Sequence, residues 1–145
     1  MKRVLVVTDN IIIFENFESI RHELNIQDWE FHYYSSPTSA VVDKYPHLKV
    51  INVKKEIDFI LENFDLVFSA HCQQIFPTEL VNNIRCINIH PGLNPFNRGW
   101  YPQAFSCINK LPFGATIHEI DDEIDHGAII DQIETVKVFT FTCLS

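Results

Sequence analysis

Residues 3–10 read RVLVVTDN, and this stretch sets the fold of the N-terminal half of the chain. A short run of branched apolar residues that stops at a polar turn is typical of a buried strand, here residues 3–8. Apolar residues then recur at helical spacing, which predicts a helix over residues 12–25, on Ile13, Phe17, Ile20 and Leu24. A buried strand followed at once by an amphipathic helix is the first half of a βαβ unit.

The same alternation continues to residue 90. Further strands are predicted at residues 29–34, 50–53, 65–70 and 85–90, with helices over 57–64 and 77–83 and a looser connection at 35–48. The pattern indicates an α/β fold with a doubly wound, mostly parallel sheet. Because ligands bind at the carboxyl ends of parallel strands, we expect one functional edge that contains Asp9, Asn10, His71, Cys72 and His90.

Composition restricts the class of protein. With 145 residues and 46% hydrophobic content, the chain is large enough for one domain with a substantial core. A formal net charge of −8 without a Lys/Arg cluster argues against a nucleic-acid partner. No segment approaches the roughly 18 apolar residues of a membrane span. The four cysteines form no CxxC pair, so free thiols and a cytoplasmic location are expected.

Glycine placement excludes the commonest ligands of this fold. The four glycines stand at positions 92, 99, 114 and 127, and none falls in the first ninety residues. The turn after the first strand therefore lacks the glycines through which a backbone approaches a pyrophosphate. A dinucleotide fingerprint and a P-loop are both absent.

Three polar residues in the second half carry the candidate chemistry. Asn88 and His90 stand two apart on a predicted strand, so their side chains project to the same side. An amide donor beside an imidazole suits a reaction that creates an oxyanion and moves a proton. Asp125, before His126-Gly127, is placed to orient His90. The structural alternatives are a turn-satisfying Asn88, a packed His90 and a turn-forming Asp125.

The order of motifs in residues 88–130 points to a family. NxHPG is followed by RGWYP and then by GATIHEIDDEIDHGAII. Together they resemble the 10-formyltetrahydrofolate-dependent formyltransferases. Residues 91–100, PGLNPFNRGW, look most like the sugar N-formyltransferase branch, which acts on dTDP-4-amino-4,6-dideoxyhexoses and supplies N-formylated sugars to surface glycans such as lipopolysaccharide O-antigen. The same stretch argues against glycinamide ribonucleotide as the amine.

The resemblance implies a catalytic trio of Asn88, His90 and Asp125. In this interpretation, His90 accepts a proton from the attacking sugar amine. Asn88 donates to the developing oxyanion, and Asp125 steadies the imidazolium and helps relay the proton to the leaving folate nitrogen. The formyl donor is 10-formyltetrahydrofolate, and no metal is required. Four of the seven histidines, at positions 71, 90, 118 and 126, could suggest a metal site, but their spacing fits no standard zinc motif, which disfavours a metal hydrolase.

The resemblance also implies binding residues for both substrates. The folate is expected to contact the loop Ile120, Asp121 and Asp122, with support near Thr78 and Leu80. For the nucleotide-sugar, the expected residues are Asn10, Gln73, Arg98 and Trp100. Each has a structural alternative: helix capping for Asn10, loop ordering for Arg98 and core packing for Trp100. Gln73 departs from the family pattern, since relatives carry a Lys after His71-Cys72.

The end of the chain does not follow the family pattern. Relatives continue into a C-terminal region that helps bind nucleotide and forms a homodimer. Residues 1–136 are therefore expected to be the catalytic core, and residues 137–145 an atypical tail produced by truncation or a frameshift. The alternation of apolar residues and Thr in this tail is also typical of an exposed edge strand. Two functional classes stay open: a sugar N-formyltransferase, and a non-catalytic fragment that keeps the fold and weak ligand binding.

Overall fold

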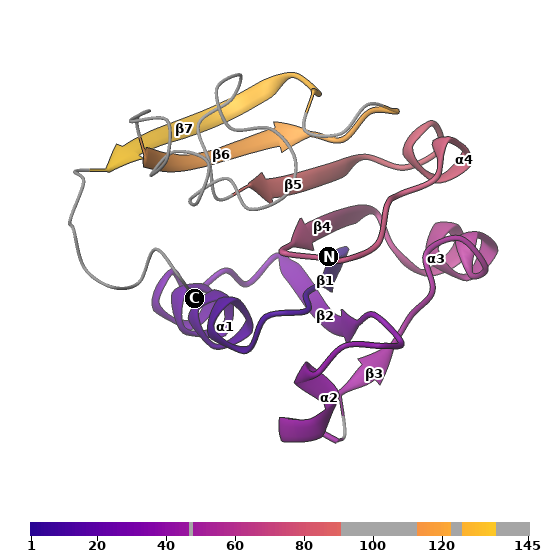
Figure 1. The fold of residues 1–145 in the computed structure, drawn as a ribbon, viewed down its shortest axis with the longest axis horizontal. Helices are drawn as coiled ribbons and strands as arrows, with labels where there is room; N and C mark the ends of the chain where they lie inside the picture. Colours follow the sequence, from indigo (N-terminus) through magenta and orange to yellow (C-terminus); the bar gives the residue numbers. More distant parts are fainter. Residues whose placement is uncertain (47, 91–112, 123–125, 136–145) are drawn as a thin grey trace. The chain divides into compact units, whose positions relative to one another are not determined.

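The computed structural model describes residues 1–46, 48–90, 113–122 and 126–135 (Figure 1). Its strands follow the hydrogen-bonded order β3-β2-β1-β4-β5-β6-β7, in a sheet that is mostly parallel with an antiparallel hairpin. The predicted α/β class is confirmed. The chain divides into two compact units, Met1–Ile87 and Asn88–Ser145.

The first unit is built on parallel strands. β1 (Lys2–Val7) pairs with β2 (Trp29–Ser35) on one side and with β4 (Leu66–Ala70) on the other, and β2 pairs with the short β3 (Lys49–Val50). Val4, Leu5, Val6 and Val7 have no exposed surface at all. A strand buried on both faces is continuously apolar rather than alternating, which is why RVLVVT is so informative a sequence.

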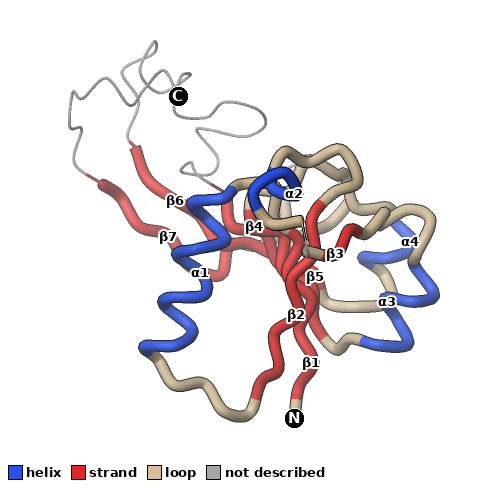
Figure 2. Tube along the Cα trace, turned by 90° about the horizontal axis from the view of Figure 1, so that it is seen from below, coloured by secondary structure: helices blue, strands red, loops and turns tan. Residues whose placement is uncertain are grey.

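Helices cover both faces of these strands, as Figure 2 shows with α1 (Ile11–Glu23) on one side and α3 (Ile57–Asn63) and α4 (Thr78–Val81) on the other. The aromatic residues of β2 divide between the two faces with period two. Phe31 and Tyr33 contact Phe17 of α1, whereas His32 and Tyr34 contact Phe64 at the end of α3. This alternation produces the doubly wound arrangement.

The second unit contains the end of β5 (Cys86–His90) and a hairpin of β6 (Phe113–Glu119) and β7 (Ile129–Thr135). The hairpin is antiparallel, and its register shifts between Ile117 and His118. A bulge of this kind changes the direction of the side chains that follow it. It falls next to the residues that make up the candidate site.

Some predicted elements were wrong in detail. The strand expected at 50–53 ends at Val50, because the Asn52 side chain accepts hydrogen bonds from the backbone N–H groups of Lys54 and Lys55 and turns the chain. The connection at 35–48 contains one helical turn, α2 (Val41–Lys44). β7 was not predicted, since its isoleucines at 129, 130 and 133 do not alternate. The expected edge strand at 137–145 lies outside the described residues.

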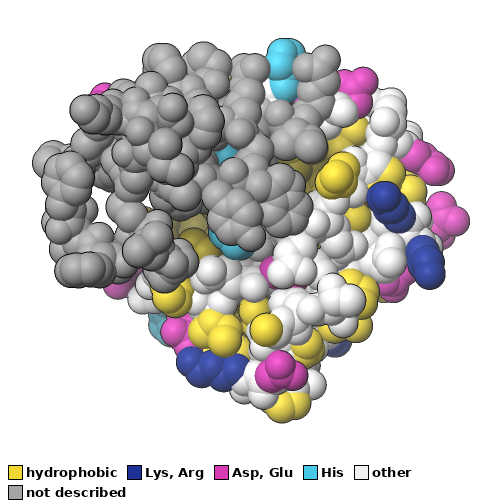
Figure 3. Space-filling model, in the orientation of Figure 1, with side chains coloured by type: hydrophobic (Ala, Val, Ile, Leu, Met, Phe, Trp, Pro, Cys, Tyr) yellow, Lys and Arg dark blue, Asp and Glu magenta, His cyan; other side chains and the backbone are white. Residues whose placement is uncertain are grey.

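Charged side chains of both signs are interspersed over the described part of the face drawn in Figure 3, without an extended basic patch there. Among the residues that the structure describes, no helix is long and apolar enough to cross a membrane.

Candidate active site

A polar cluster lies where β1, β2 and β4 end, in the first unit. The Asp9 carboxylate accepts three hydrogen bonds: from Ser36 N at 2.8 Å, from Ser36 Oγ at 2.6 Å and from Gln73 N at 2.7 Å. The Asp9 backbone N–H donates to the His71 carbonyl at 3.1 Å. Asp9 and His71 therefore do lie side by side, as their places at the strand ends predicted.

The cluster holds the loop after β4 in an uncommon conformation. His71 has a φ of 60°, in the left-handed region that non-glycine residues seldom adopt. Gln74 closes the loop from the other side, donating from Nε2 to Ser36 Oγ and to the Ile51 carbonyl and accepting from Val53 N. Gln73 is thereby anchored through its backbone while its side chain is exposed. Gln73 is one of the four residues expected to contact the nucleotide-sugar.

Cys72 sits inside this cluster and is not a thiolate. Burial is the largest cause that raises the pKa of its thiol to about 12, and the charge of the nearby Asp9 carboxylate acts in the same direction. The thiol contacts Ser36 Oγ at 3.8 Å and accepts from Gln74 N at 3.4 Å. An uncharged and partly buried thiol is a poor nucleophile, so Cys72 has a packing role here.

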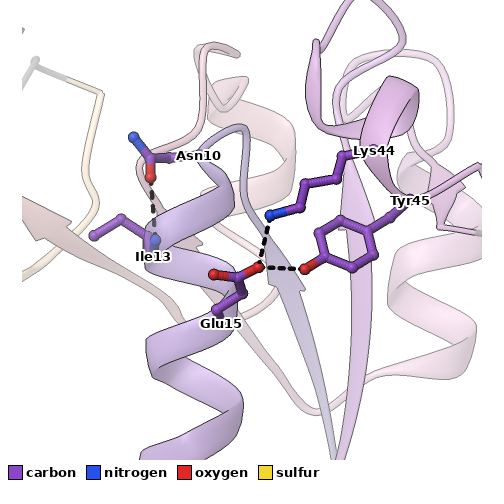
Figure 4. Close-up of polar contacts among 5 residues, drawn as sticks. All are labelled: Asn10, Ile13, Glu15, Lys44 and Tyr45. Carbon is purple, nitrogen blue, oxygen red and sulfur yellow. Dashed lines mark hydrogen bonds and ion pairs between the residues drawn. The ribbon is translucent and has the colours of Figure 1, made fainter.

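Asn10 caps α1. Its Oδ1 accepts from Ile13 N at 3.1 Å, and its backbone is extended, as an N-cap requires (Figure 4). Figure 4 also shows Lys44 and Tyr45 both donating to Glu15, which ties α1 to the segment around α2. The capping alternative for Asn10 is thus realised in the structure. The cap uses Oδ1, and the amide Nδ2 points away from Ile13 (Figure 4).

The second unit contains the predicted catalytic pair on β5 and a third residue beside it. Asn88 Nδ2 lies 3.2 Å from His118 Nε2, and the ring centroids of His90 and His118 are 6.3 Å apart with an edge-on inclination of 67°. His90 is 3% exposed and His118 is 2% exposed. Asn88 and His90 therefore lie against the same imidazole, which comes from the neighbouring strand in chain order.

The remaining predicted residues are distributed over both units. Thr78 is exposed and Leu80 is buried in α4 of the first unit. Ile120, Asp121 and Asp122 follow β6 in the second unit, where Asp121 Oδ2 lies 3.3 Å from His126 Nδ1. Asp125, Arg98 and Trp100 lie outside the described residues. In the described ranges, no group of three His, Cys, Asp or Glu side chains is placed to hold a metal ion.

Four polar residues of these clusters were not predicted from the sequence to have a function. Ser36, Gln74 and His118 received no function, and Asp9 was expected only to lie at the edge. A signal for His118 was present, since residues 116–118 read TIH, and two polar residues that stand two apart lie on the same side of a strand. Its contact with Asn88 spans thirty positions, which no local pattern records.

The fold is that of an α/β protein, and each of its two units carries a cluster of polar side chains. In proteins of this class, ligands bind next to the carboxyl ends of the strands. A sequence profile described as Formyl transferase matches residues 33–141. The chain belongs to the formyltransferase family. It is 41% identical over 131 residues to dTDP-4-amino-4,6-dideoxyglucose formyltransferase of Mycobacterium bovis, covering 90% of this chain and 53% of that protein.

Solved structures give the same result. A 4-N formyltransferase from Francisella tularensis is 49% identical and superposes with a TM-score of 0.84, over 94% of this chain and 57% of that one. The formyltransferase PseJ from Anoxybacillus kamchatkensis, 23% identical with a TM-score of 0.62 over 94% of this chain and 61% of that one, shares the fold. Its structure is a complex with UDP-4,6-dideoxy-4-formamido-L-AltNAc and tetrahydrofolate. The chain spans about half the length of the curated sugar formyltransferases it matches.

Proposed function

We propose that this chain carries the catalytic core of a sugar N-formyltransferase. In this proposal the enzyme transfers the formyl group of 10-formyltetrahydrofolate to the 4-amino group of a dTDP-4-amino-4,6-dideoxyhexose. The observation that carries it is the Asn88, His90 and His118 cluster, in a chain of this family that is 41% and 49% identical to two sugar formyltransferases. Surface glycans such as O-antigen are the proposed destination of the product.

The chemistry requires three contributions from the protein. The sugar amine forms a bond to the formyl carbon, and His90 takes the proton that the amine loses. Asn88 donates a hydrogen bond to the oxygen, which becomes an oxyanion when the carbon turns tetrahedral. The carbon–nitrogen bond to the folate then breaks, and the proton passes to the leaving nitrogen. Asp125 is proposed to stabilise the charged imidazole of His90 between these steps.

Binding is assigned by position. Thr78, Leu80, Ile120, Asp121 and Asp122 are proposed for the folate; Asn10, Gln73, Arg98 and Trp100 are proposed for the nucleotide-sugar. The anchored backbone of Gln73 supports this assignment, as does the Nδ2 of Asn10, which points away from the capped Ile13. Gln73 is uncharged, so it can donate a hydrogen bond to the diphosphate but cannot neutralise its charge. The guanidinium of Arg98 is therefore proposed to form the main ion pair with the diphosphate.

The test is direct. The purified chain is incubated with 10-formyltetrahydrofolate and dTDP-4-amino-4,6-dideoxyglucose, and the formylated nucleotide-sugar is sought by mass spectrometry. Formation that depends on both substrates and is lost in His90→Ala supports the proposal. Full activity in His90→Ala overturns the assignment of the base.

A second candidate is a folded domain that binds its ligands weakly without turnover, since the chain spans only about half the length of the relatives it matches. Isothermal titration with tetrahydrofolate and with dTDP separates the two. Binding of either ligand without any formylated product, under conditions where a relative of full length is active, supports this second candidate.

A further inference from the structure

His118 is held between two hydrogen-bonding partners inside the second unit. Its Nδ1 lies 2.7 Å from the carbonyl oxygen of Glu119, and its Nε2 lies 3.2 Å from Nδ2 of Asn88. The ring is 2% exposed, so solvent does not compete strongly for these nitrogens. The side chain is fixed at both ends.

The Glu119 carbonyl determines which nitrogen of the ring carries the proton. A carbonyl oxygen only accepts, so His118 Nδ1 must be the donor in the 2.7 Å contact. In the neutral ring, Nε2 is then an acceptor. The contact with Asn88 is therefore a hydrogen bond donated by the Asn88 Nδ2 amide. The opposite amide orientation would place Asn88 Oδ1 against a lone pair and is unfavourable.

The backbone of the β6–β7 hairpin holds the Glu119 carbonyl in place. Its N–H donates to the Ala128 carbonyl at 2.9 Å, which joins the end of β6 to the start of β7. The register shift between Ile117 and His118 redirects the side chain of His118 at the same point. The carbonyl that fixes the tautomer is thus held by the hairpin itself.

We propose that His118 is a positioning residue that fixes the orientation of the Asn88 carboxamide, so that its nitrogen rather than its oxygen faces the reaction. This rests on the proposed function, in which Asn88 donates to the developing oxyanion. Nδ2 carries two hydrogens, so the same amide nitrogen can donate both to His118 and to a second acceptor. A donor that is already oriented does not have to reorganise as charge develops, and this is the source of its catalytic effect.

A pair of substitutions separates positioning from packing. The amide of Gln reaches the place of Nε2 and can accept from Asn88, whereas the shorter Asn reaches only the place of Nδ1. We expect His118→Asn to lower kcat by at least about tenfold and His118→Gln by less than about threefold, because one oxyanion donor is worth about 10²–10³ in rate. The KM for the nucleotide-sugar should change little in both. Equal losses in the two variants, or a loss confined to KM, would overturn the proposal.

A spectroscopic measurement tests the same proposal without turnover. In the ¹⁵N-labelled chain, long-range ¹H–¹⁵N correlations of the ring should show His118 protonated on Nδ1, the minor tautomer in free histidine. Cross-relaxation should connect the Asn88 side-chain amide to the His118 ring. Protonation on Nε2 instead would contradict the proposal. If the wild type forms no product but shows the Nδ1 tautomer and this contact, the proposed function fails while the positioning contact stands.

Discussion

Gly127 lies directly against the backbone of Glu119: a Cβ at position 127 would be 1.7 Å from the Glu119 carbonyl oxygen. The Gly127→Ala substitution must therefore displace the carbonyl that accepts from His118. We expect a loss of about 1–3 kcal/mol in the free energy of unfolding, as for other overpacked sites. Urea unfolding followed by circular dichroism measures it.

The neighbouring Ala128 provides the control for this experiment. Its side chain is exposed, so Ala128→Ser should change the free energy of unfolding by less than about 0.5 kcal/mol. If Gly127→Ala is as stable as the wild type, the close approach of the two backbones is not a requirement of the hairpin.

Asp9 should stabilise the loop after β4. The Asp9→Asn substitution keeps the shape of the side chain but replaces one carboxylate oxygen by an NH₂ group. This group cannot accept the hydrogen bonds that Ser36 and Gln73 donate to Asp9. The expected loss is about 1–3 kcal/mol in the free energy of unfolding, since hydrogen bonds to a charged group are strong. Asp43→Asn, on the exposed surface of α2, is the matched control. Equal stability of the two variants would show that the Asp9 contacts contribute nothing.

Asn10 has two separable roles. Asn10→Ser keeps a capping oxygen and removes the amide Nδ2, whereas Asn10→Ala removes both. We expect Asn10→Ala to lose about 1 kcal/mol of stability and Asn10→Ser to lose much less. If Nδ2 contacts the nucleotide-sugar, both variants should raise the KM for that substrate to a similar extent. A normal KM in Asn10→Ser would leave helix capping as the whole function of this residue.

The catalytic assignment predicts large losses without unfolding. Asn88→Ala, His90→Ala and Asp125→Ala should each lower kcat by at least about a hundredfold, because each removes an oxyanion donor, a base or its orienting charge. Steady-state rates and melting temperatures are measured together on each variant. A variant that keeps most of its activity loses its place in the trio.

Cys72 should resist alkylation in the folded protein. With the pKa of its thiol at about 12, only a minute fraction is thiolate at pH 8, and the side chain is largely shielded. Peptide mapping after iodoacetamide treatment should find Cys72 unmodified in buffer and modified in urea. Asp9→Asn removes a neighbouring charge that raises this pKa, so it should make labelling faster. Rapid labelling of the folded wild type would contradict the structure.

The sequence by itself determined the layered α/β fold and the presence of Asn88 and His90 on one strand. Both follow from local periodicity: a strand buried on two faces is continuously apolar, and residues two apart share a face. The family resemblance could also be recognised from the sequence, because each of its motifs is a contiguous stretch of residues. Helix capping by Asn10 was one of two alternatives for this residue, and local sequence could suggest it because the contact spans only three positions.

Tertiary structure alone decided which partners these residues have. His118 meets Asn88 across thirty positions, and Asp9 meets Ser36 and Gln73 across 27 and 64 positions. Such contacts depend on where separate strands end and on a register shift in a hairpin, neither of which leaves a periodic trace in the sequence. The orientation of the Asn88 amide is set in this way, by a carbonyl that only the folded hairpin brings to the ring of His118.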